Sequence, residues 1–505
     1  MKRPVSMPRR KFLGHLGHCF TLGSTAALLP QLGLIPRAMA QAADYRALVC
    51  IYLAGANDSY NWLVPRDADA AGSHYDRYRT ARGGVWSGSN TAGLALGFDD
   101  LLPIQPSGGA AFGLHPSCGD FTAVTGDSSQ NHGGIQNLFN QGKAAFVCNA
   151  GPLVQPISKL EYNAGAPRPP QLFSHNDQEL LWHIGMAAPS DPVARYGWGG
   201  RVAKSTAGGA LEIGLSPSIS VAGSARFLIG DGILPYQISP SGANTLDNYQ
   251  TSVAGSLASA RREVLDGMLA DAYGDPFTRG YADTLQRSLT VGESLDALLN
   301  AADGSGGLQT VFPEGNSLAD QLKVVASMIK VSRASLSATR QVFYVRYGSF
   351  DLHDGMFDSG GTLTDSGHGE LLTALNQAVG AFWSALGEIG ARDKVTTFTM
   401  SDFGRTLSGN GSGSDHAWGG NLMVLGDAVR GGALYGSYPQ MVLNADDNNA
   451  MDWSFTRGQY IPTTSVDQVA ATLARWMGVS DGSALDAMFP LLGNFASGDL
   501  GFMNT

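Results

Sequence analysis

VTTFTMSDFGRT, residues 395–406, is the stretch from which the fold can be worked out. It begins with a largely apolar run of strand-forming residues, and Asp402 follows almost directly after that run. A second run, QVFYVRY at 341–347, is followed in the same way by Asp351. Because the parallel strands of an α/β protein end at one edge of the sheet, we expect both carboxylates at that edge.

Other carboxylate and imidazole side chains follow predicted strands or loops in a similar way. The run ALVCIYL at 47–53 precedes Asp58, and His416 follows the loop GNGSGS. Carboxylate and imidazole ligands suit Zn and, with more oxygen ligands, Mn, Mg or Ca. For Asp58 the alternative is a turn in which it only caps the backbone. We predict a site for one or two divalent ions with the ligands Asp58, Asp351, His353, Asp402 and His416.

Two further residues are candidates for catalysis. Ser174 precedes a predicted helix at 179–183, where it is either a helix cap or a nucleophile at the positive end of the helix dipole. Arg405 either holds a substrate oxyanion with two hydrogen bonds or pairs with a neighbouring carboxylate. The sequence leaves both pairs of alternatives open.

The first 40 residues have the features of an export signal. RRKFL at 9–13 is a twin-arginine pattern, a mostly apolar stretch extends to Ile35, and AMA follows at 38–40. We predict a signal peptide that is cleaved before Gln41, recognition by the twin-arginine translocation machinery, and a periplasmic or secreted mature protein. The alternative is a basic helix or a membrane anchor. No later stretch resembles a membrane span.

Charge and cysteine content exclude some classes of function. The chain has 505 residues and a formal net charge of −10. Removal of the signal peptide takes away six basic residues and no acidic ones, so the mature charge is −10 minus 6, or −16. The six are Lys2, Arg3, Arg9, Arg10, Lys11 and Arg37. This balance disfavours nucleic acid as a partner. Three cysteines remain, Cys50, Cys118 and Cys148, so we expect at most one disulfide and no cysteine-based metal site.

Strand and helix signals alternate along most of the chain. Helices are expected at 135–140, 179–183, 318–336, 370–386 and 465–478, and strands at 47–53, 144–149, 341–347 and 395–400. This alternation predicts an α/β fold, a three-layer α/β/α sandwich with a largely parallel sheet. We expect a single domain over 41–505 with an inserted helical cap at about 246–302. Residues 66–132 are typical of a long surface excursion with short helices, and 201–221 of strand and turn.

The chain resembles a secreted bacterial family of unknown function, numbered 1501, in motifs that span nearly the whole mature chain. In chain order these motifs are GANDSYN, FSHNDQ, FDLHDG, SDFGRT, SDHAWGG and DQVAATLARWMGV. That family is similar to the alkaline phosphatase and sulfatase superfamily. The resemblance implies an α/β/α sandwich with two metal sites at the carboxyl edge of its sheet.

The resemblance also implies a role for each candidate residue. Asp351, His353 and His416 would form one metal site, and Asp58 and Asp402 the other, together with Ser174 as the nucleophile. Phe403 is a departure, because many superfamily members have a second histidine ligand there. The spacing from Asp351 to His353 is also shorter than in alkaline phosphatases. His175 or Asn57 would then have to complete the second site.

These observations predict an exported metal-dependent hydrolase of phosphate or sulfate esters, acting on a small-molecule or polymer ester through Ser174. The alternative is a secreted protein without catalytic activity that retains the fold and one structural metal and takes part in surface or matrix assembly. Phe403 favours the alternative, whereas the joint presence of the five predicted ligands favours the enzyme.

Overall fold

The computed structural model describes most of the chain between Asp44 and Asn504. The described residues are 44–186, 191–207, 214–243, 245–246, 249, 255–301, 307–358, 362–445 and 454–504. The predicted signal peptide, residues 1–40, and its cleavage point lie outside them. Within the described ranges, no helix is both long and apolar enough to cross a membrane.

A nine-stranded sheet forms the centre of the fold. In spatial order its strands are β13 (Leu434–Gly436), β7 (Ala144–Gly151), β12 (Gly420–Leu425), β11 (Val395–Ser401), β1 (Arg46–Leu53), β10 (Arg340–Tyr347), β8 (Ser218–Ser220) and β9 (Tyr236–Gln237), and β14 (Thr464–Ser465) also pairs with β7. Every pair is parallel except those of β12 with β11 and β7. The prediction of an α/β fold with a largely parallel sheet is confirmed.

Strand β1 shows why both faces of the sheet are buried. Val49 and Ile51 belong to one hydrophobic core, and Leu48 and Cys50 belong to the other. This division arises because successive side chains of a strand point to opposite faces. All four side chains are fully buried. A continuous apolar run of this kind is typical of a parallel strand between two helical layers.

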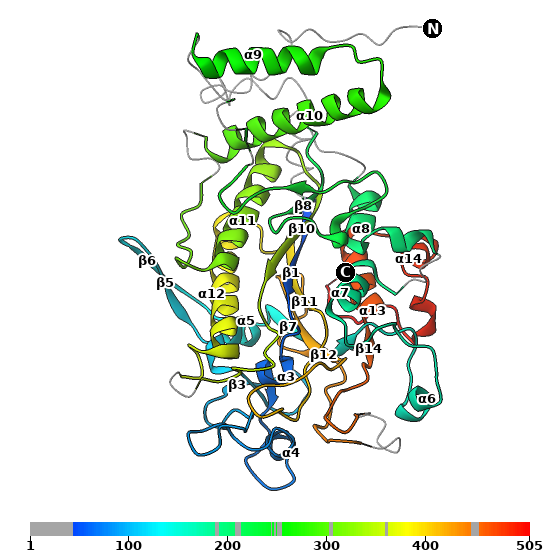
Figure 1. The fold of residues 1–505 in the computed structure, drawn as a ribbon. Coiled ribbons are helices and arrows are strands. Elements are labelled where there is room, and N and C mark those ends of the chain that lie inside the picture. The colour runs from blue at the N-terminus through cyan, green and yellow to red at the C-terminus, as the bar shows by residue number, and fades with distance from the viewer. Residues whose placement is uncertain are drawn as a thin grey trace.

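Helices cover both faces of the sheet (Figure 1). One core includes side chains of α5 (Ile135–Asn140), α11 (Ser317–Ser335) and α12 (Gly367–Glu388), and the other includes side chains of α7 (His175–Ile184), α8 (Trp198–Thr206) and α13 (Val466–Met477). The arrangement is the predicted three-layer sandwich. Helix α13, expected at 465–478, begins with a capping box of Ser465 and Gln468 and ends at Gly478 with φ 102°.

Two segments differ from the prediction. Residues 201–221 are expected to form strand and turn, but their first part belongs to α8, and β8 is the only strand among the described residues of this stretch. Gly199 and Gly200 weaken the local helix signal, yet they allow α8 to pack closely on Phe227 and the backbone of Ile229.

The excursion at 66–132 contains more strand than expected. Strand β2 (Leu63–Pro65) comes just before it. The excursion itself contains α4 (His74–Ala81), β3 (Leu102–Ile104), β4 (Phe112–Leu114), β5 (Phe121–Thr125) and β6 (Ser128–His132).

The stretch predicted as a helical insertion contains α9 (Leu257–Ala270) and α10 (Pro276–Leu299). Pro276 opens α10, where its missing N–H leaves no helical hydrogen bond unmade. Val291 and Leu295 of α10 share a core with Ile219 of β8. The two helices therefore lie by the β8 end of the sheet, and they form one end of the molecule in Figure 1.

Candidate metal centre

Three neighbouring parallel strands end at the same edge of the sheet. Leu53 at the end of β1 is in register with Tyr347 of β10 and Ser401 of β11. The loops after these strands therefore begin side by side, as expected for the carboxyl edge of an open sheet. Gly55 in the first loop has φ 99°, and a Cβ there would lie 2.6 Å from the backbone nitrogen of Asp351. Glycine is thus required for the close approach of these two loops.

The loop between β11 and β12 is tied to the loop after β10 by an arginine. Arg405 and His416 face each other across an antiparallel backbone bridge. The fully buried guanidinium of Arg405 donates a hydrogen bond of 2.6 Å from Nη1 to Asp351 Oδ1. Through this pair the two loops hold Asp351 and His416 next to each other.

Four side chains converge at this edge: His175, Asp351, His353 and His416. Nε2 of His416 lies 2.8 Å from Nε2 of His353 and 3.2 Å from Nε2 of His175. Asp351 Oδ1 lies 3.3 Å from His416 Nε2 and 3.2 Å from His353 Nε2, and Asp351 Oδ2 lies 3.4 Å from His175 Nε2. The four side chains are 22 to 44% exposed, so the cluster is open to solvent.

The second ring nitrogen of each of these histidines has a hydrogen-bond acceptor. Nδ1 of His175 lies 2.5 Å from Asp402 Oδ2. Nδ1 of His353 lies 2.8 Å from Asp415 Oδ1, and Nδ1 of His416 lies 2.8 Å from the carbonyl oxygen of Phe173. Carboxylate and carbonyl oxygens only accept, so each Nδ1 carries the proton and each Nε2 presents a lone pair. Three lone pairs and a carboxylate at such short distances repel one another unless a cation lies between them.

The distances within the cluster fit a zinc ion. Zinc lies about 2.0 to 2.1 Å from its nitrogen and oxygen ligands, which places two ligands of a tetrahedral site about 3.3 Å apart. The five separations given above run from 2.8 to 3.4 Å. The ligand atoms of His175, Asp351 and His416 all lie within 4.8 Å of one another, and His353 contacts the last two. The three described cysteines are buried and free and do not belong to it.

The contacts within the cluster shift the pKa values of its members. The hydrogen bond to Asp402 raises the pKa of His175, and burial lowers the pKa of His416. Burial would raise the pKa of Asp351, but the hydrogen bond and charge of Arg405 hold it below its usual value. A carboxylate on the far nitrogen of a histidine makes that histidine a stronger metal ligand.

Asp402 holds a ligand of the cluster and does not itself face it. Its Oδ2 contacts His175 Nδ1 and accepts a hydrogen bond of 3.2 Å from the backbone nitrogen of Gly55. Its Oδ1 accepts from the hydroxyl of Tyr52. Both oxygens of Asp402 thus have donors in this structure, and its sequence-based assignment as a ligand stays a prediction.

Asp58 pairs with an arginine instead of joining the cluster. Its Oδ1 lies 2.6 Å from Arg82 Nη2, and both side chains are at most 1% exposed. Asn57, the suggested substitute ligand, lies with its Oδ1 2.8 Å from Nε2 of His368. The expected second ligand set around Asp58 and Asp402 is thus not assembled among the described residues, and the assignment of Asp58 as a ligand stays a prediction.

The two catalytic candidates have different surroundings. Ser174 occupies the N-cap of α7, but its hydroxyl caps no backbone N–H and donates to Asp177 Oδ2 at 2.5 Å. Arg405 contacts Asp351 and Ser414 and is fully buried. Of the two alternatives for Arg405, the structure shows the pairing with a carboxylate.

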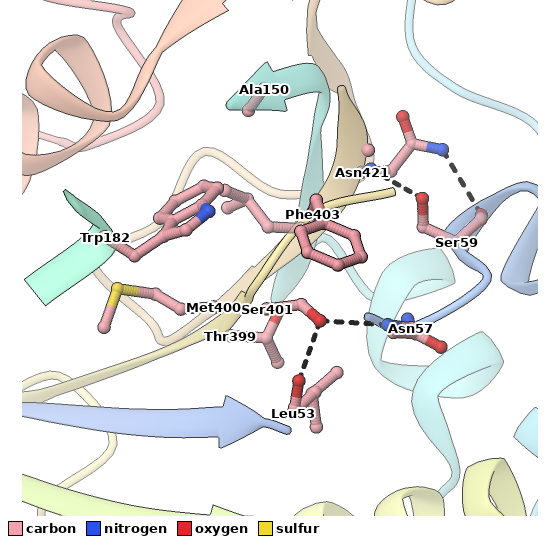
Figure 2. A pocket seen from close by; sticks show the side chains of 12 residues that line it. Leu53, Asn57, Ser59, Ala150, Trp182, Thr399, Met400, Ser401, Phe403 and Asn421 are labelled. Atoms are coloured by element: carbon pink, nitrogen blue, oxygen red, sulfur yellow. Dashed lines mark hydrogen bonds between the residues drawn. The ribbon is translucent and has the colours of Figure 1, made fainter. Parts of the chain in front are cut away.

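Phe403 forms an apolar wall behind the cluster. Its ring centroid lies 4.8 Å from that of His175 and 4.6 Å from that of His416. Figure 2 shows Phe403 at a small cavity of about 20 Å³, beside which the hydroxyl of Ser401 bridges the backbones of Asn57 and Leu53. A cavity of this size holds one water molecule. Phe403 thus supplies an apolar contact where the resemblance implies a histidine.

Three contributors to the site were not among the predicted site residues. His175 was considered only as a substitute ligand, although it directly follows Ser174 in FSHNDQ. Asp415 holds the far nitrogen of His353 and contacts Arg457. Tyr52 lies within an apolar strand, where the sequence gives no signal that its hydroxyl contacts a site. The sequence does give a signal for the first two, since each is a polar residue next to a predicted site residue: His175 follows Ser174, and Asp415 precedes His416.

The fold and the site define an α/β protein with three histidines and one aspartate gathered at the carboxyl edge of its sheet. The family described as "Protein of unknown function (DUF1501)" matches residues 45–489, and the chain belongs to this family. No curated protein matches the sequence.

Several solved structures show weak similarity to this chain. Ps i-CgsB in complex with k-i-k-neocarrahexaose is 12% identical, with 70% of this chain and 69% of that chain covered and a TM-score of 0.28. The PsFucS1 sulfatase from Pseudoalteromonas sp. is 11% identical, with 86% and 77% covered and a TM-score of 0.29. A mutant of the alkaline phosphatase PafA is 11% identical, with 72% and 64% covered and a TM-score of 0.25. Similarity at this level carries no argument about activity.

Proposed function

We propose that this protein is an exported, metal-dependent hydrolase of phosphate or sulfate esters. The observation that carries the proposal is the convergence of three Nε2 lone pairs on the Asp351 carboxylate, at distances of 3.2 to 3.4 Å. These side chains would hold one divalent ion, and imidazole and carboxylate ligands favour Zn over the alternatives Mn, Mg and Ca. Such an ion supplies a Lewis acid that stabilises negative charge on an ester oxygen.

The charges around the cluster support an anionic substrate group. Three aspartates at this edge are each paired with an arginine: Asp58 with Arg82, Asp351 with Arg405 and Asp415 with Arg457. Their negative charges are thus balanced within the protein, and a divalent cation would add positive charge at a position open to solvent. Phosphate and sulfate esters, whether small molecules or polymers, carry the complementary charge.

Ser174 is the proposed nucleophile. Its neighbours in the chain both contact the cluster, Phe173 through its carbonyl oxygen and His175 through its ring. The carboxylate of Asp177 accepts the Ser174 hydroxyl proton in a hydrogen bond and is placed to act as general base. The amino end of α7 favours the negative charge that develops on the oxygen. Arg405 contributes by holding Asp351 and not by contacting the substrate.

One observation favours the second candidate function, a secreted protein without turnover. The Arg405 guanidinium is fully buried and pairs with Asp351, so it is not a free catalytic group at the cluster. The metal would then be structural, and the protein would act in surface or matrix assembly.

Metal analysis combined with an ester screen separates the two functions. Natively exported protein is analysed for divalent metals and assayed with aryl phosphates and aryl sulfates. We expect about one equivalent of metal and turnover of one ester class, both lost in His416→Ala. Asp354→Asn changes an exposed carboxylate next to His353 and should keep both. Metal without turnover would support the non-catalytic function, and wild-type protein without metal would refute the centre.

Export rests on the sequence of the first 40 residues. The twin-arginine pattern at 9–13 and AMA at 38–40 support transport by the twin-arginine machinery to the periplasm or beyond. Replacing Arg9 and Arg10 by lysine should retain the precursor in the cytoplasm. Amino-terminal sequencing of the exported wild type should begin at Gln41, and an uncleaved chain would contradict the proposal.

A further inference from the structure

A buried chain of hydrogen bonds connects β1 to the cluster. The hydroxyl of Tyr52 donates to Asp402 Oδ1, and Asp402 Oδ2 lies 2.5 Å from Nδ1 of His175. Nε2 of His175 in turn lies 3.2 Å from His416 Nε2 and 3.4 Å from Asp351 Oδ2. Tyr52 is 0% and Asp402 2% exposed, so water does not compete for these bonds.

The aromatic ring of Tyr52 is fixed on both sides. The ring of Tyr344 stacks on it with 6.2 Å between centroids, and the ring of His183 meets it edge-on at 5.2 Å. Burial raises the pKa of the Tyr52 hydroxyl well above its ordinary value, and the nearby charge of Asp402 adds to this. The hydroxyl therefore keeps its proton and remains a donor.

We infer that Tyr52 is a positioning residue for the metal centre: by holding Oδ1 of Asp402 it directs Oδ2 to Nδ1 of His175. The proton of His175 then stays on Nδ1, and Nε2 presents its lone pair to the metal. This inference concerns metal binding, so it stands whether or not the protein hydrolyses esters.

Loss of the Tyr52 hydroxyl would leave a buried carboxylate oxygen without a donor. Such an oxygen is unfavourable, so the Asp402 carboxylate would turn toward another donor and release Nδ1 of His175. The released ring can carry its proton on either nitrogen. A purely structural role of Tyr52 would affect packing but would not change which nitrogen of His175 carries the proton.

Zinc affinity and histidine tautomers test the inference in the same variants. Zinc binding to metal-free full-length protein is measured by chelator competition, and the tautomers are read by NMR of protein with ¹⁵N-labelled histidine. In Tyr52→Phe we expect zinc binding about 10- to 100-fold weaker and loss of the Nδ1–H form of His175. Tyr344→Phe, which removes the hydroxyl of the stacked ring, is the matched control and should bind zinc like the wild type.

Two results would overturn the inference. The first is Tyr52→Phe with wild-type zinc affinity and an unchanged His175 tautomer. The second is an equal weakening in Tyr344→Phe, which would mark a general effect of packing. Should Tyr52→Phe fail to fold by circular dichroism, Asp402→Ala supplies the test, because it removes the oxygen that accepts from Nδ1 of His175. Zinc binding retained in Asp402→Ala would equally refute the inference.

Discussion

The guanidinium of Arg82 lies 2.6 Å from the carboxylate of Asp58, and both side chains are at most 1% exposed. Asp58 follows β1 as Asp351 follows β10, so its position in the chain is that of a ligand. Its negative charge is nevertheless balanced by a fixed positive charge of the protein. A second divalent ion would have to compete with this arginine, and we therefore expect the centre to take one ion.

Removal of Arg82 should show how strongly the fold depends on this pair. Arg82→Met leaves Asp58 as an unpaired buried carboxylate, and we expect a loss of about 3 to 5 kcal/mol in the free energy of unfolding. Arg79→Met, at a partly exposed arginine paired with Asp69 and Asp76, should cost less than about 1 kcal/mol. Urea denaturation measures both. Equal losses in the two variants would show that the buried pair contributes no more to the free energy of unfolding than the partly exposed pairs do.

The metal content of two further variants separates ligands from non-ligands. Asp58→Asn should retain about one equivalent of zinc, because Asp58 does not face the cluster, whereas His353→Ala should bind zinc at least about tenfold more weakly. Native mass spectrometry gives the stoichiometry, and chelator competition gives the affinity. Two zinc ions in the wild type, with one lost in Asp58→Asn, would show Asp58 to be a ligand.

A buried carboxylate far from the cluster predicts a pH dependence of stability. Asp467 is fully buried, and burial raises its pKa to about 6 despite the hydrogen bond from Met186 and the charge of Arg201. The folded chain therefore keeps this proton up to about pH 6, whereas the unfolded chain loses it near pH 4. Because the folded state binds more protons in this window, the contribution of Asp467 to stability falls as pH rises from 4 to 6.

Asp467→Asn should remove this component of the pH dependence. Its amide oxygen can still accept from the Met186 N–H, so the stability of the variant relative to the wild type should rise by about 2 to 3 kcal/mol between pH 4 and pH 7. Urea denaturation at several pH values gives the difference. Asp99→Asn, at an exposed position, is the control. A difference that stays constant with pH would show that Asp467 titrates normally.

The sequence predicted the architecture better than it predicted the site. Strand β1 and helix α13 follow from local signals, a continuous apolar run and a capping box with a terminal glycine, and both are present. Helix α8 was missed because Gly199 and Gly200 suppress the helix signal, while burial of Trp198 and Val202 in the core stabilises the helix.

The sequence does not show the hydrogen-bond partner of a carboxylate when that partner is distant in the chain. Asp58 and Asp402 both follow strands, as predicted. In the structure Arg82 pairs with the Asp58 carboxylate, and the Tyr52 hydroxyl donates a hydrogen bond to the Asp402 carboxylate. A strand-end position tells which edge of the sheet a side chain reaches. It does not tell which donor from another segment meets it there, because that depends on the tertiary contacts. His175 is suggested by the sequence only as a substitute ligand, since it reaches the cluster from a helix and not from a strand end.

The role of Ser174 can be decided with one substitution and one control. Its hydroxyl donates to Asp177 and caps no backbone N–H, so Ser174→Ala should lower stability by less than about 0.5 kcal/mol, whereas loss of a true helix cap costs about 0.5 to 2 kcal/mol. Ser73 is such a cap in α4, since its side chain accepts from the N–H of Asp76. Ser73→Ala should therefore lower the melting temperature and leave activity intact.

Ser174→Ala should do the reverse if Ser174 is the nucleophile. We expect turnover of any ester that the wild type hydrolyses to be abolished, with zinc content and melting temperature almost unchanged, because the four ligand side chains are not altered. A thermal melt, metal analysis and an ester assay on the two serine variants give the comparison. Full activity in Ser174→Ala would exclude this serine and would leave a water molecule as the attacking group, since the open side of the cluster is accessible to solvent.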